Sequence, residues 1–318
     1  RKPWMTAILA LVLGPVVGML YLNQGRKAVF YLMATLFLYG LPFAIVHAGL
    51  MDFDPVAVAG TLPLILNIIG AAHCFVQAQN FKKEVPLRWY ARWHSIVFLF
   101  YLLPLFVAVG FRWVIYEPFH IPAGSMSPNI NIGDYLFAQK YAYGYGPYSF
   151  PLGTLFLKGS TPEKEPERGD IILFGHPQAP EIVYIKRVIG LPGDTVQMRN
   201  GKVFINGTEM PQEKANDDFR FIDPAEGEKT IPVYFETLPN GRTYKVLDEH
   251  AEGVLDNTEM YRVPDGHYFV LGDNRDNTVD SRLLNDVGFV PRQNITARAG
   301  VILWNGQTRK FSYKRIGE

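Results

Sequence analysis

The stretch EIVYIKRVIG, residues 181–190, has the pattern of a β-strand. Side chains alternate between the two faces of a strand, so the even-numbered positions from Tyr184 to Val188 share one face and the odd-numbered positions from Val183 to Ile189 share the other. Apolar residues occupy most positions on both faces. The stretch therefore predicts a strand, and this strand sets the class of the domain around it.

Further runs of this kind lie on either side and are separated by turns rich in Gly, Pro, Asn and Asp. Asn200-Gly201 predicts a hairpin, and no long helical periodicity occurs between the runs. We therefore expect a mostly-β domain, an antiparallel and partly open barrel or sandwich, with an inserted β-rich subdomain over about residues 208–263. The runs are RGDIILFGHP (168–177), DTVQMRNGKVFING (194–207), HYFVLGD (267–273) and ARAGVILWNG (297–306).

The preceding part of the chain has a different composition. Of the 318 residues, 48% are hydrophobic and 19% are charged, but the long apolar runs fall almost entirely within residues 1–117. Each run is close to the ~20 residues that a helix needs to cross a bilayer. The sequence predicts an N-terminal α-helical membrane region, residues 1–117, followed by a second domain, residues 118–318. The expected spans are residues 5–22, 28–50, 55–78 and 95–116.

Charge in the connections between these runs predicts their orientation. The connection between the second and third runs holds Asp52 and Asp54 and no basic residue. Basic loops stay on the cytoplasmic side, so the fourth run should deliver residue 118 to the outer face. Arg1 and Lys2 then fall on the outer side, a conflict that a re-entrant first segment would remove. The basic residues of the other two connections are Arg26, Lys27, Lys82, Lys83, Arg88 and Arg92.

Charge, cysteine content and histidine spacing exclude several classes of protein. A net charge of +1 gives no reason to expect a nucleic-acid partner. Cys74 is the only cysteine, so an internal disulfide is excluded. The histidines form no HExxH motif, and DNRDNTVD (273–280) lacks the glycine and the final glutamate of a calcium loop. We expect neither a metal nor a cofactor.

Lys186 stands in the middle of the predicted strand with apolar neighbours. One interpretation is a lysine that protects an edge strand or extends its amine to solvent. The other is a general base. A free lysine, with a pKa of ~10.4, is protonated near neutrality, but burial can lower that pKa by ~3–5 units and make the neutral amine available.

A matching nucleophile lies in IPAGSMSPNIN, residues 121–131, directly after the fourth apolar run. A serine hydroxyl needs an adjacent base, and Ser-Lys is a recurring form of that pair. Gly124 would let a carbonyl group approach Ser125, and Pro122 and Pro128 would stiffen the loop. Taken alone, this segment predicts only a turn.

Three ordered segments together resemble the sequence boxes of bacterial type I signal peptidases, membrane-anchored Ser/Lys proteases that remove secretory signal peptides. The resemblance covers about residues 117–304, and it is weak in the first three apolar runs and in the insertion. The segments are EPFHIPAGSMSPNINIGDYLF (117–137), RGDIILF with YIKRVIGLPGD (168–194), and GDNRDNTVDSR with GFVP (272–291).

The resemblance implies a role for each matching residue. Ser125 would be the nucleophile, its backbone N–H would bind the oxyanion, and Lys186 would be the general base. Thr278 would hydrogen-bond the lysine amine and orient it. A supporting charge network would comprise Arg187, Asp273, Arg275, Asp280 and Arg282. Shallow apolar pockets for small P1 and P3 side chains would be lined by Ile121, Met126, Ile130, Tyr184 and Ile185.

One position departs from the common pattern of the family. Many relatives have a serine two residues before the nucleophile, where its hydroxyl helps to bind the oxyanion, and this chain has Ala123. Removing one such donor costs ~10²–10³ in turnover in another serine protease. Other relatives have glycine at this position, so we expect weaker or differently arranged oxyanion binding rather than inactivity.

The function implied is that of a serine endopeptidase that removes signal peptides from exported pre-proteins after small residues at P3 and P1, through an acyl-enzyme. The implied partners are signal peptides, the lipid bilayer and the secretion translocon, and the implied location is the bacterial inner membrane, multi-pass, with the catalytic domain on the outer (periplasmic) face. Two alternatives stay open: a narrow-substrate maturation peptidase of the same chemistry, and a non-catalytic membrane adaptor with this fold. Self-cleaving repressors also use Ser and Lys, but four apolar runs and a net charge of +1 argue against them.

Overall fold

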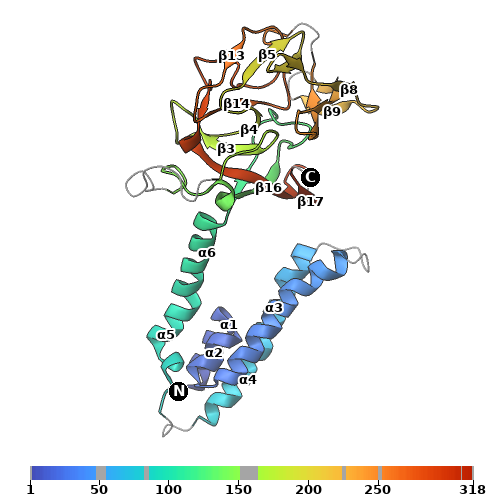
Figure 1. Ribbon diagram of the computed structural model, residues 1–318. Coiled ribbons are helices and arrows are strands. Elements are labelled where there is room, and N and C mark those ends of the chain that lie inside the picture. The colour runs from blue at the N-terminus through green and yellow to red at the C-terminus, as the bar shows by residue number, and fades with distance from the viewer. Residues whose placement is uncertain are drawn as a thin grey trace. The chain divides into compact units, whose positions relative to one another are not determined.

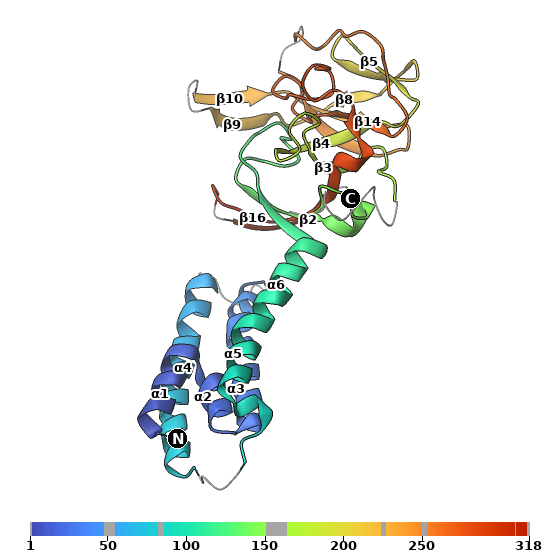
Figure 2. The ribbon, with the colours of Figure 1, turned by 90° about the vertical axis from the view of Figure 1, so that its left-hand side faces the viewer.

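The computed structural model describes residues 2–47, 55–81, 86–150, 164–223, 227–249, 253–308 and 310–316. The chain divides into two compact units, Arg1–Ala108 and Val109–Glu318. The first is helical and the second is built from strands (Figures 1 and 2).

The helical unit begins with two short helices, α1 (Pro3–Leu13) and α2 (Pro15–Tyr21). Gly14 separates them with a φ of 90°, a conformation that glycine tolerates, and Pro15 then starts α2 at a position where its missing N–H is harmless. Longer helices follow, and α4 packs against both α1 and α3. They are α3 (Gly25–His47), α4 (Pro55–Gln79), the 3₁₀ turn η1 (Trp89–Ala91), α5 (Trp93–Val97), the π-helical turn η2 (Phe98–Leu102) and α6 (Leu103–Val114).

Two helical segments are long and apolar enough to cross a membrane, among the residues described: Val58–Gln79 and Trp93–Val114, with mean hydropathies of 1.7 and 2.1. They match the third and fourth predicted spans. The prediction of four spans is not confirmed. The first run is divided at Gly14 into helices of 11 and 7 residues, each shorter than the ~20 that a crossing needs.

One large antiparallel sheet forms the centre of the β-rich unit and curls into a half-barrel. Its first strand, β1, starts two residues after α6 ends. Register shifts in β16 between Ala299 and Val301 and between Ile302 and Trp304 mark irregularities of the kind that bend a strand. The sheet order is β1 (Tyr116–His120), β2 (Asp134–Gln139), β16 (Ile295–Asn305), β3 (Ile171–Gly175), β4 (Val183–Gly190), β14 (His267–Leu271) and β15 (Val290–Pro291), with β17 (Lys310–Arg315) also paired to β16.

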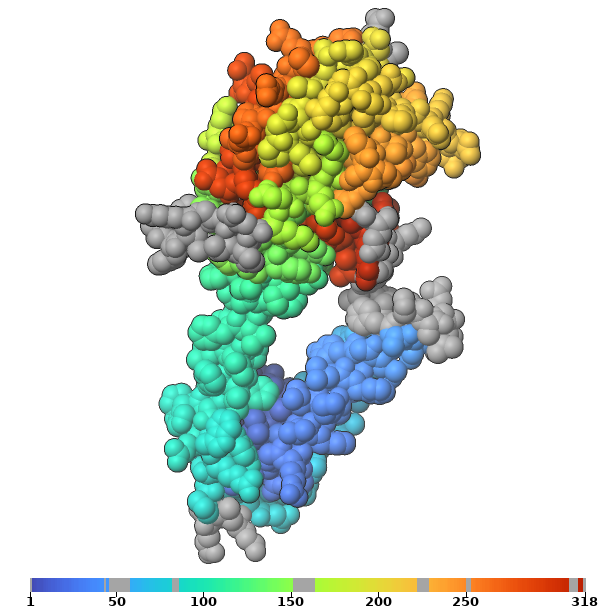
Figure 3. Space-filling model, in the orientation of Figure 1, coloured from blue at the N-terminus to red at the C-terminus, as the bar shows by residue number. Residues whose placement is uncertain are grey.

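Three smaller antiparallel sheets adjoin the large one. Their strands, yellow to orange in Figure 3, lie together at the end of this unit away from β16 and β17 (Figures 1 and 3). The hairpin predicted at Asn200-Gly201 joins β5 to β6, and both residues have positive φ, as a tight hairpin turn requires. The sheets are β13 (Tyr261–Arg262), β5 (Thr195–Arg199), β6 (Lys202–Ile205) and β7 (Thr208–Glu209); β12 (Thr243–Leu247), β11 (Val233–Thr237) and β8 (Gln212–Lys214); and β10 (Gly227–Ile231) with β9 (Phe219–Asp223). Among the described residues of this unit, η3 (Lys140–Tyr143) and η4 (Arg292–Asn294) are 3₁₀ turns.

The large sheet buries apolar side chains on both faces, which explains the nearly continuous apolar sequence of β3 and β4. In β3, Ile171 and Leu173 contribute to one core cluster, and Ile172 and Phe174 contribute to another. Alternation along a strand sends neighbouring residues to opposite faces. β4 pairs with β3 and is therefore held between two cores, so a polar residue in it is cut off from water.

Candidate active site

Ser125 lies in the turn that joins β1 to β2. Backbone hydrogen bonds close this turn, from the N–H of Ser127 to the carbonyl of Gly124 at 3.1 Å and from the N–H of Ile130 to the carbonyl of Met126 at 3.0 Å. Met126 and Ile130 are 2% and 0% exposed and anchor the turn in the core. The serine is thus presented by a fixed backbone.

Lys186 lies on β4, directly opposite Ile172 of β3, and only 3% of its surface is exposed. Its Nζ donates a hydrogen bond to Ser125 Oγ at 3.0 Å and another to the carbonyl of Ile185 at 3.1 Å. The two residues are 61 positions apart in the chain, and sheet pairing brings them together.

Burial lowers the pKa of Lys186 from 10.5 to about 8, although the charges of Asp280 and Asp273 act in the opposite direction. The nitrogen also lies 5.4 Å from the centre of the Tyr184 ring. With such a pKa, about a tenth of the molecules have a neutral amine at pH 7. The pair can therefore transfer a proton from a hydroxyl group near neutral pH.

A cavity of about 330 Å³ opens beside Ser125 and Lys186. The five residues predicted to form the substrate pocket all line this cavity. Among the lining residues that sequence reasoning did not assign to the pocket are the large apolar side chains of Phe119, Ile182 and Val183. Their position next to the motifs could have identified them, since Ile182 and Val183 directly precede Tyr184 in the sequence.

The backbone N–H of Ser125 makes no hydrogen bond with another group of the chain, within the described residues. It is therefore available to a ligand in the cavity. Ala123 also lines the cavity and has no polar side-chain atom to offer. Weaker or differently arranged binding of the oxyanion, expected from Ala123, therefore remains a prediction.

The predicted hydrogen bond between Thr278 and Lys186 is absent. Thr278 Oγ1 is buried without a hydrogen-bond partner, and Lys186 uses the carbonyl of Ile185 instead. Thr278 is nevertheless close to the nucleophile, because a Cβ at Gly272 would collide both with its hydroxyl and with the carbonyl of Ser125. Its role in orienting the lysine remains a prediction.

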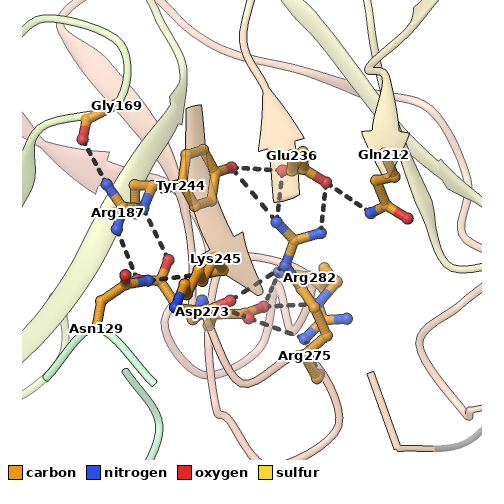
Figure 4. A network of polar contacts seen from close by, with 12 residues as sticks. Asn129, Gly169, Arg187, Gln212, Glu236, Tyr244, Lys245, Asp273, Arg275 and Arg282 are labelled. Carbon is orange, nitrogen blue, oxygen red and sulfur yellow. Dashed lines mark hydrogen bonds and ion pairs between the residues drawn. The ribbon is translucent and has the colours of Figure 1, made fainter. Parts of the chain in front are cut away.

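The predicted charge network contains three ion pairs, and further contacts join them (Figure 4). Arg282 donates to the carbonyl of Arg275, and the guanidinium of Arg187 lies 3.9 Å from the centre of the Tyr244 ring. Arg187 donates from Nε and Nη2 to the two carboxylate oxygens of Asp273 at 2.7 and 2.6 Å, and from Nη1 to the carbonyl of Gly169. Asp273 also accepts a hydrogen bond from Asn129, four residues after the nucleophile. This pair therefore links the strand of the lysine to the turn of the serine.

A second pair joins Asp280 to Arg282 at 2.9 Å, and both side chains are completely buried. Asp280 accepts a hydrogen bond from the N–H of Gly272, and Arg282 donates to the carbonyl of Arg275 at 2.6 Å. The pair thus fixes the backbone loop that packs against Ser125 and Thr278.

Arg275 pairs with Glu236 of β11, a residue that sequence reasoning missed. The guanidinium donates to both carboxylate oxygens at 2.6 and 3.0 Å, and Glu236 is 0% exposed. Tyr244 and Gln212 donate to the same carboxylate (Figure 4). These donors keep the pKa of Glu236 below its usual value despite its burial. Its only sequence signal was a glutamate in an otherwise apolar strand, VYFET.

Asp248, Asp256 and Asp276 form the one group with the geometry of a metal site among the described residues, with one carboxylate oxygen from each lying within 4.8 Å of the others. Burial and the two neighbouring carboxylates raise the pKa of Asp248 to about 6. Acidic groups of this kind commonly exist without a metal, so the group carries no assignment.

Comparison with known proteins places this chain in a family. The model of the family described as signal peptidase, peptidase S26, matches residues 92–304. The chain belongs to this family.

Curated relatives agree with this assignment. Signal peptidase I of Rickettsia massiliae is 40% identical over 236 residues, which cover 71% of this chain and 84% of that protein. Signal peptidase I of Rickettsia prowazekii is 40% identical over 210 residues, 62% of this chain and 75% of that protein. A crystal structure of a signal peptidase I from Enterococcus faecalis matches 42% of this chain and 97% of that chain at 27% identity, with a TM-score of 0.26.

Membership in the signal peptidase family makes the chain a serine endopeptidase of the signal peptidase I type. The family match begins in the segment that precedes α5 and ends in β16, so it includes both Ser125 and Lys186. Most of the helical unit lies outside it.

Proposed function

We propose that Ser125 and Lys186 are the nucleophile and the general base of a membrane-bound peptidase that removes signal peptides from exported pre-proteins. The observation that carries the proposal is that Lys186 is only 3% exposed and that its Nζ lies 3.0 Å from Ser125 Oγ. Burial lowers the pKa of this lysine to about 8, which agrees with the proposed role. A protein tolerates such a buried lysine at a cost in stability, and active sites are where such costs concentrate.

This geometry supports the following reaction. The neutral amine of Lys186 accepts the proton of Ser125 as Oγ attacks the carbonyl carbon of the scissile bond. The backbone N–H of Ser125 stabilises the developing oxyanion. The C–N bond breaks, the leaving amine takes the proton from Lys186, and an ester joins the signal peptide to Ser125. Water, deprotonated by the same amine, hydrolyses the ester and restores the serine.

The apolar cavity beside the dyad suits small side chains of a signal peptide. The cavity has a volume of about 330 Å³. It is lined on one side by the segment from Phe119 to Ser125 and on another by the β4 residues before Lys186. An extended peptide bound between these two segments would place alternate side chains, P1 and P3, toward the same wall. Met126 and Ile130 limit the size of those side chains.

Membrane anchoring and orientation belong to the same proposal. Val58–Gln79 and Trp93–Val114 support at least two crossings, and the four predicted spans and the multi-pass topology remain predictions. By the positive-inside rule, the basic connections support an orientation with the β-rich unit on the outer face of the inner membrane. The bilayer, and the translocon that delivers the substrate, are the expected neighbours there.

The test uses the full chain in detergent with a pre-protein whose signal peptide ends in Ala-x-Ala. We expect cleavage by the wild type, and a loss of at least ~10³-fold in rate for Lys186→Ala and for Ser125→Ala. Lys202→Ala, which removes an exposed lysine on β6, is the matched control and should cleave normally. Equal cleavage by Lys186→Ala and the wild type would reject the assigned base.

Two further results would replace the proposal. Cleavage of one exported precursor out of a panel would indicate a narrow-substrate maturation peptidase. A wild-type chain that cleaves none of them, together with an unchanged phenotype for Ser125→Ala in cells, would indicate an adaptor.

A further inference from the structure

A second cavity, of about 560 Å³, lies in the β-rich unit and shares no lining residue with the cavity at Ser125. Strands β11, β12 and β17 and the turn after Ser125 contribute to its wall. Its lining is strongly basic, with the cations Arg187, Arg242, Lys245, Lys314 and Arg315.

Carboxylates neutralise two of these cations. Arg187 is paired with Asp273 at 2.6 Å. Arg242 donates to Asp170 at 2.7 Å and to Glu167 at 2.6 Å. These two guanidinium groups therefore have little unsatisfied charge to offer a ligand.

Lys245 and Lys314 differ, because neither has an ion-pair partner among the described residues. The ammonium group of Lys245 lies 5.7 Å from the centre of the Phe235 ring. Lys314 donates to the carbonyl of Asn129 at 2.8 Å. Burial and the neighbouring charges of Lys245 and Arg187 lower the pKa of Lys314, although Asp134 and Asp273 act in the opposite direction. A bound anion would reduce the repulsion between the two lysines.

The rest of the lining indicates what that anion is attached to. Ile171, Phe235, Tyr244 and Ile316 give the cavity an apolar side next to the lysines. A free inorganic anion would gain nothing from this surface, whereas an amphiphile with a charged head and an apolar body would be held by both parts.

Lipid is the amphiphile that this chain meets, because two of its helices are apolar and long enough to cross a bilayer. Lys314 lies on β17, which belongs to the large sheet, and the first strand of that sheet follows directly after the apolar segment Trp93–Val114. β17 pairs with β16, β16 with β2 and β2 with β1, and β1 begins at Tyr116, two residues after α6 ends.

We propose that this cavity binds the phosphate group of an anionic phospholipid, with Lys245 and Lys314 paired to the phosphate and the apolar wall in contact with the glycerol and the first methylene groups. The site rests on the membrane anchoring proposed above but not on the peptidase chemistry, so a loss of lipid binding and a loss of cleavage are separate outcomes.

The test is a titration of the full chain in non-ionic detergent at low salt with dihexanoylphosphatidylglycerol and with dihexanoylphosphatidylcholine, followed by calorimetry. We expect the anionic lipid to bind at least ~10-fold more tightly than the zwitterionic one. The double variant Lys245→Ala, Lys314→Ala should lose that difference. The double variant Lys245→Arg, Lys314→Arg should keep it, which separates charge from a failure to fold.

The matched control removes two lysines from strands that do not line the cavity. Lys202→Ala with Lys214→Ala changes the net charge equally and should leave the affinity unchanged. Equal affinities for the two lipids, or an unchanged affinity in the alanine double variant, would overturn the proposal.

Two soluble competitors test the source of the phosphate and the class of ligand. Inorganic phosphate should bind at least ~10-fold more weakly than phosphatidylglycerol, and equal binding would overturn the assignment to lipid. A short Asp- and Glu-rich peptide that displaced the lipid at a lower concentration than phosphate does would assign the cavity to a protein partner and would also overturn it.

Discussion

Lys186 is the residue on which the chemistry depends, and its ionisation should set the pH dependence of cleavage. Only the neutral amine accepts a proton, and burial lowers the pKa to about 8. We expect kcat/KM to rise about tenfold per pH unit below that value and to level off above it. Peptide cleavage measured from about pH 6 to about pH 10 checks this. A profile that is flat through pH 8, or that falls there, would contradict it.

The same burial has a consequence for stability. A pKa lowered from 10.5 to about 8 corresponds to about 3 kcal/mol. The unfolded chain binds the proton more tightly, so this cost is fully present below the folded pKa of about 8 and disappears as pH rises toward 10.5. Lys186→Met should therefore abolish cleavage but raise the melting temperature at pH 7, with a smaller gain at pH 10.

The matched control for this prediction is Lys202→Met. Lys202 is exposed and pairs with Glu209 at the surface, so its replacement should leave the melting temperature nearly unchanged. Thermal unfolding in detergent at the two pH values measures both variants. A Lys186→Met protein that melts below the wild type at pH 7 would show that the lysine contributes more through its contacts than it costs through burial.

At the residue level, the sequence predicted the residues that lie within its motifs, but it did not predict contacts between residues that only the fold brings together. Ser125 and Lys186 were predicted because both lie in ordered motifs that resemble those of a known family, whereas the turn and the apolar strand around them left other interpretations open. Glu236 was missed because its partner, Arg275, lies 39 residues away and no local sequence pattern predicts the pairing. The expected bond to Thr278 failed for a similar reason, since a distance between side chains depends on packing that sequence does not give.

Strands were easier to predict than their order. All five predicted strand segments contain strands, among them β3, β4, β14 and β16, because alternation and turn residues are local signals. The position of β16 between β2 and β3 was not predictable, because it pairs residues more than 100 positions apart. The helical segments show the opposite limit, since hydropathy favoured one span over residues 5–22 although Gly14-Pro15 divides that run into two short helices.

β11 should contribute to stability mainly through Glu236. This residue gives the buried guanidinium of Arg275 its only carboxylate partner among the described residues. Removing one partner of a buried pair leaves an uncompensated charge and costs about 3–5 kcal/mol. We expect Glu236→Ala to lower the melting temperature markedly and to reduce cleavage, because Arg275 also donates to the carbonyl of Gly272 beside Ser125.

Glu209→Ala is the control for this prediction, since it breaks an exposed pair with Lys202 and should cost at most about 1 kcal/mol. Thermal unfolding and cleavage assays on the two variants measure the difference. If both variants melted alike, the pair between β11 and the loop of Arg275 would have no structural importance.

For the whole molecule, the decisive question is which side of the membrane each part of the chain occupies. The basic residues after α4 predict that Asn80 is cytoplasmic, whereas β6 of the catalytic unit should be outside. Cys74, the only cysteine, is buried and can be replaced by Ala to give a chain without thiols. Asn80→Cys and Lys202→Cys in that background then place one thiol at each position.

We expect a membrane-impermeant maleimide to label Lys202→Cys in intact spheroplasts and to label Asn80→Cys only after the membrane is opened with detergent. Both positions are exposed, so burial does not explain a difference between them. Cleavage of an exported precursor by each variant confirms that the labelled protein is folded. Labelling of Asn80→Cys in intact spheroplasts would reverse the orientation and would leave the serine on the side of the membrane where signal peptides are not released.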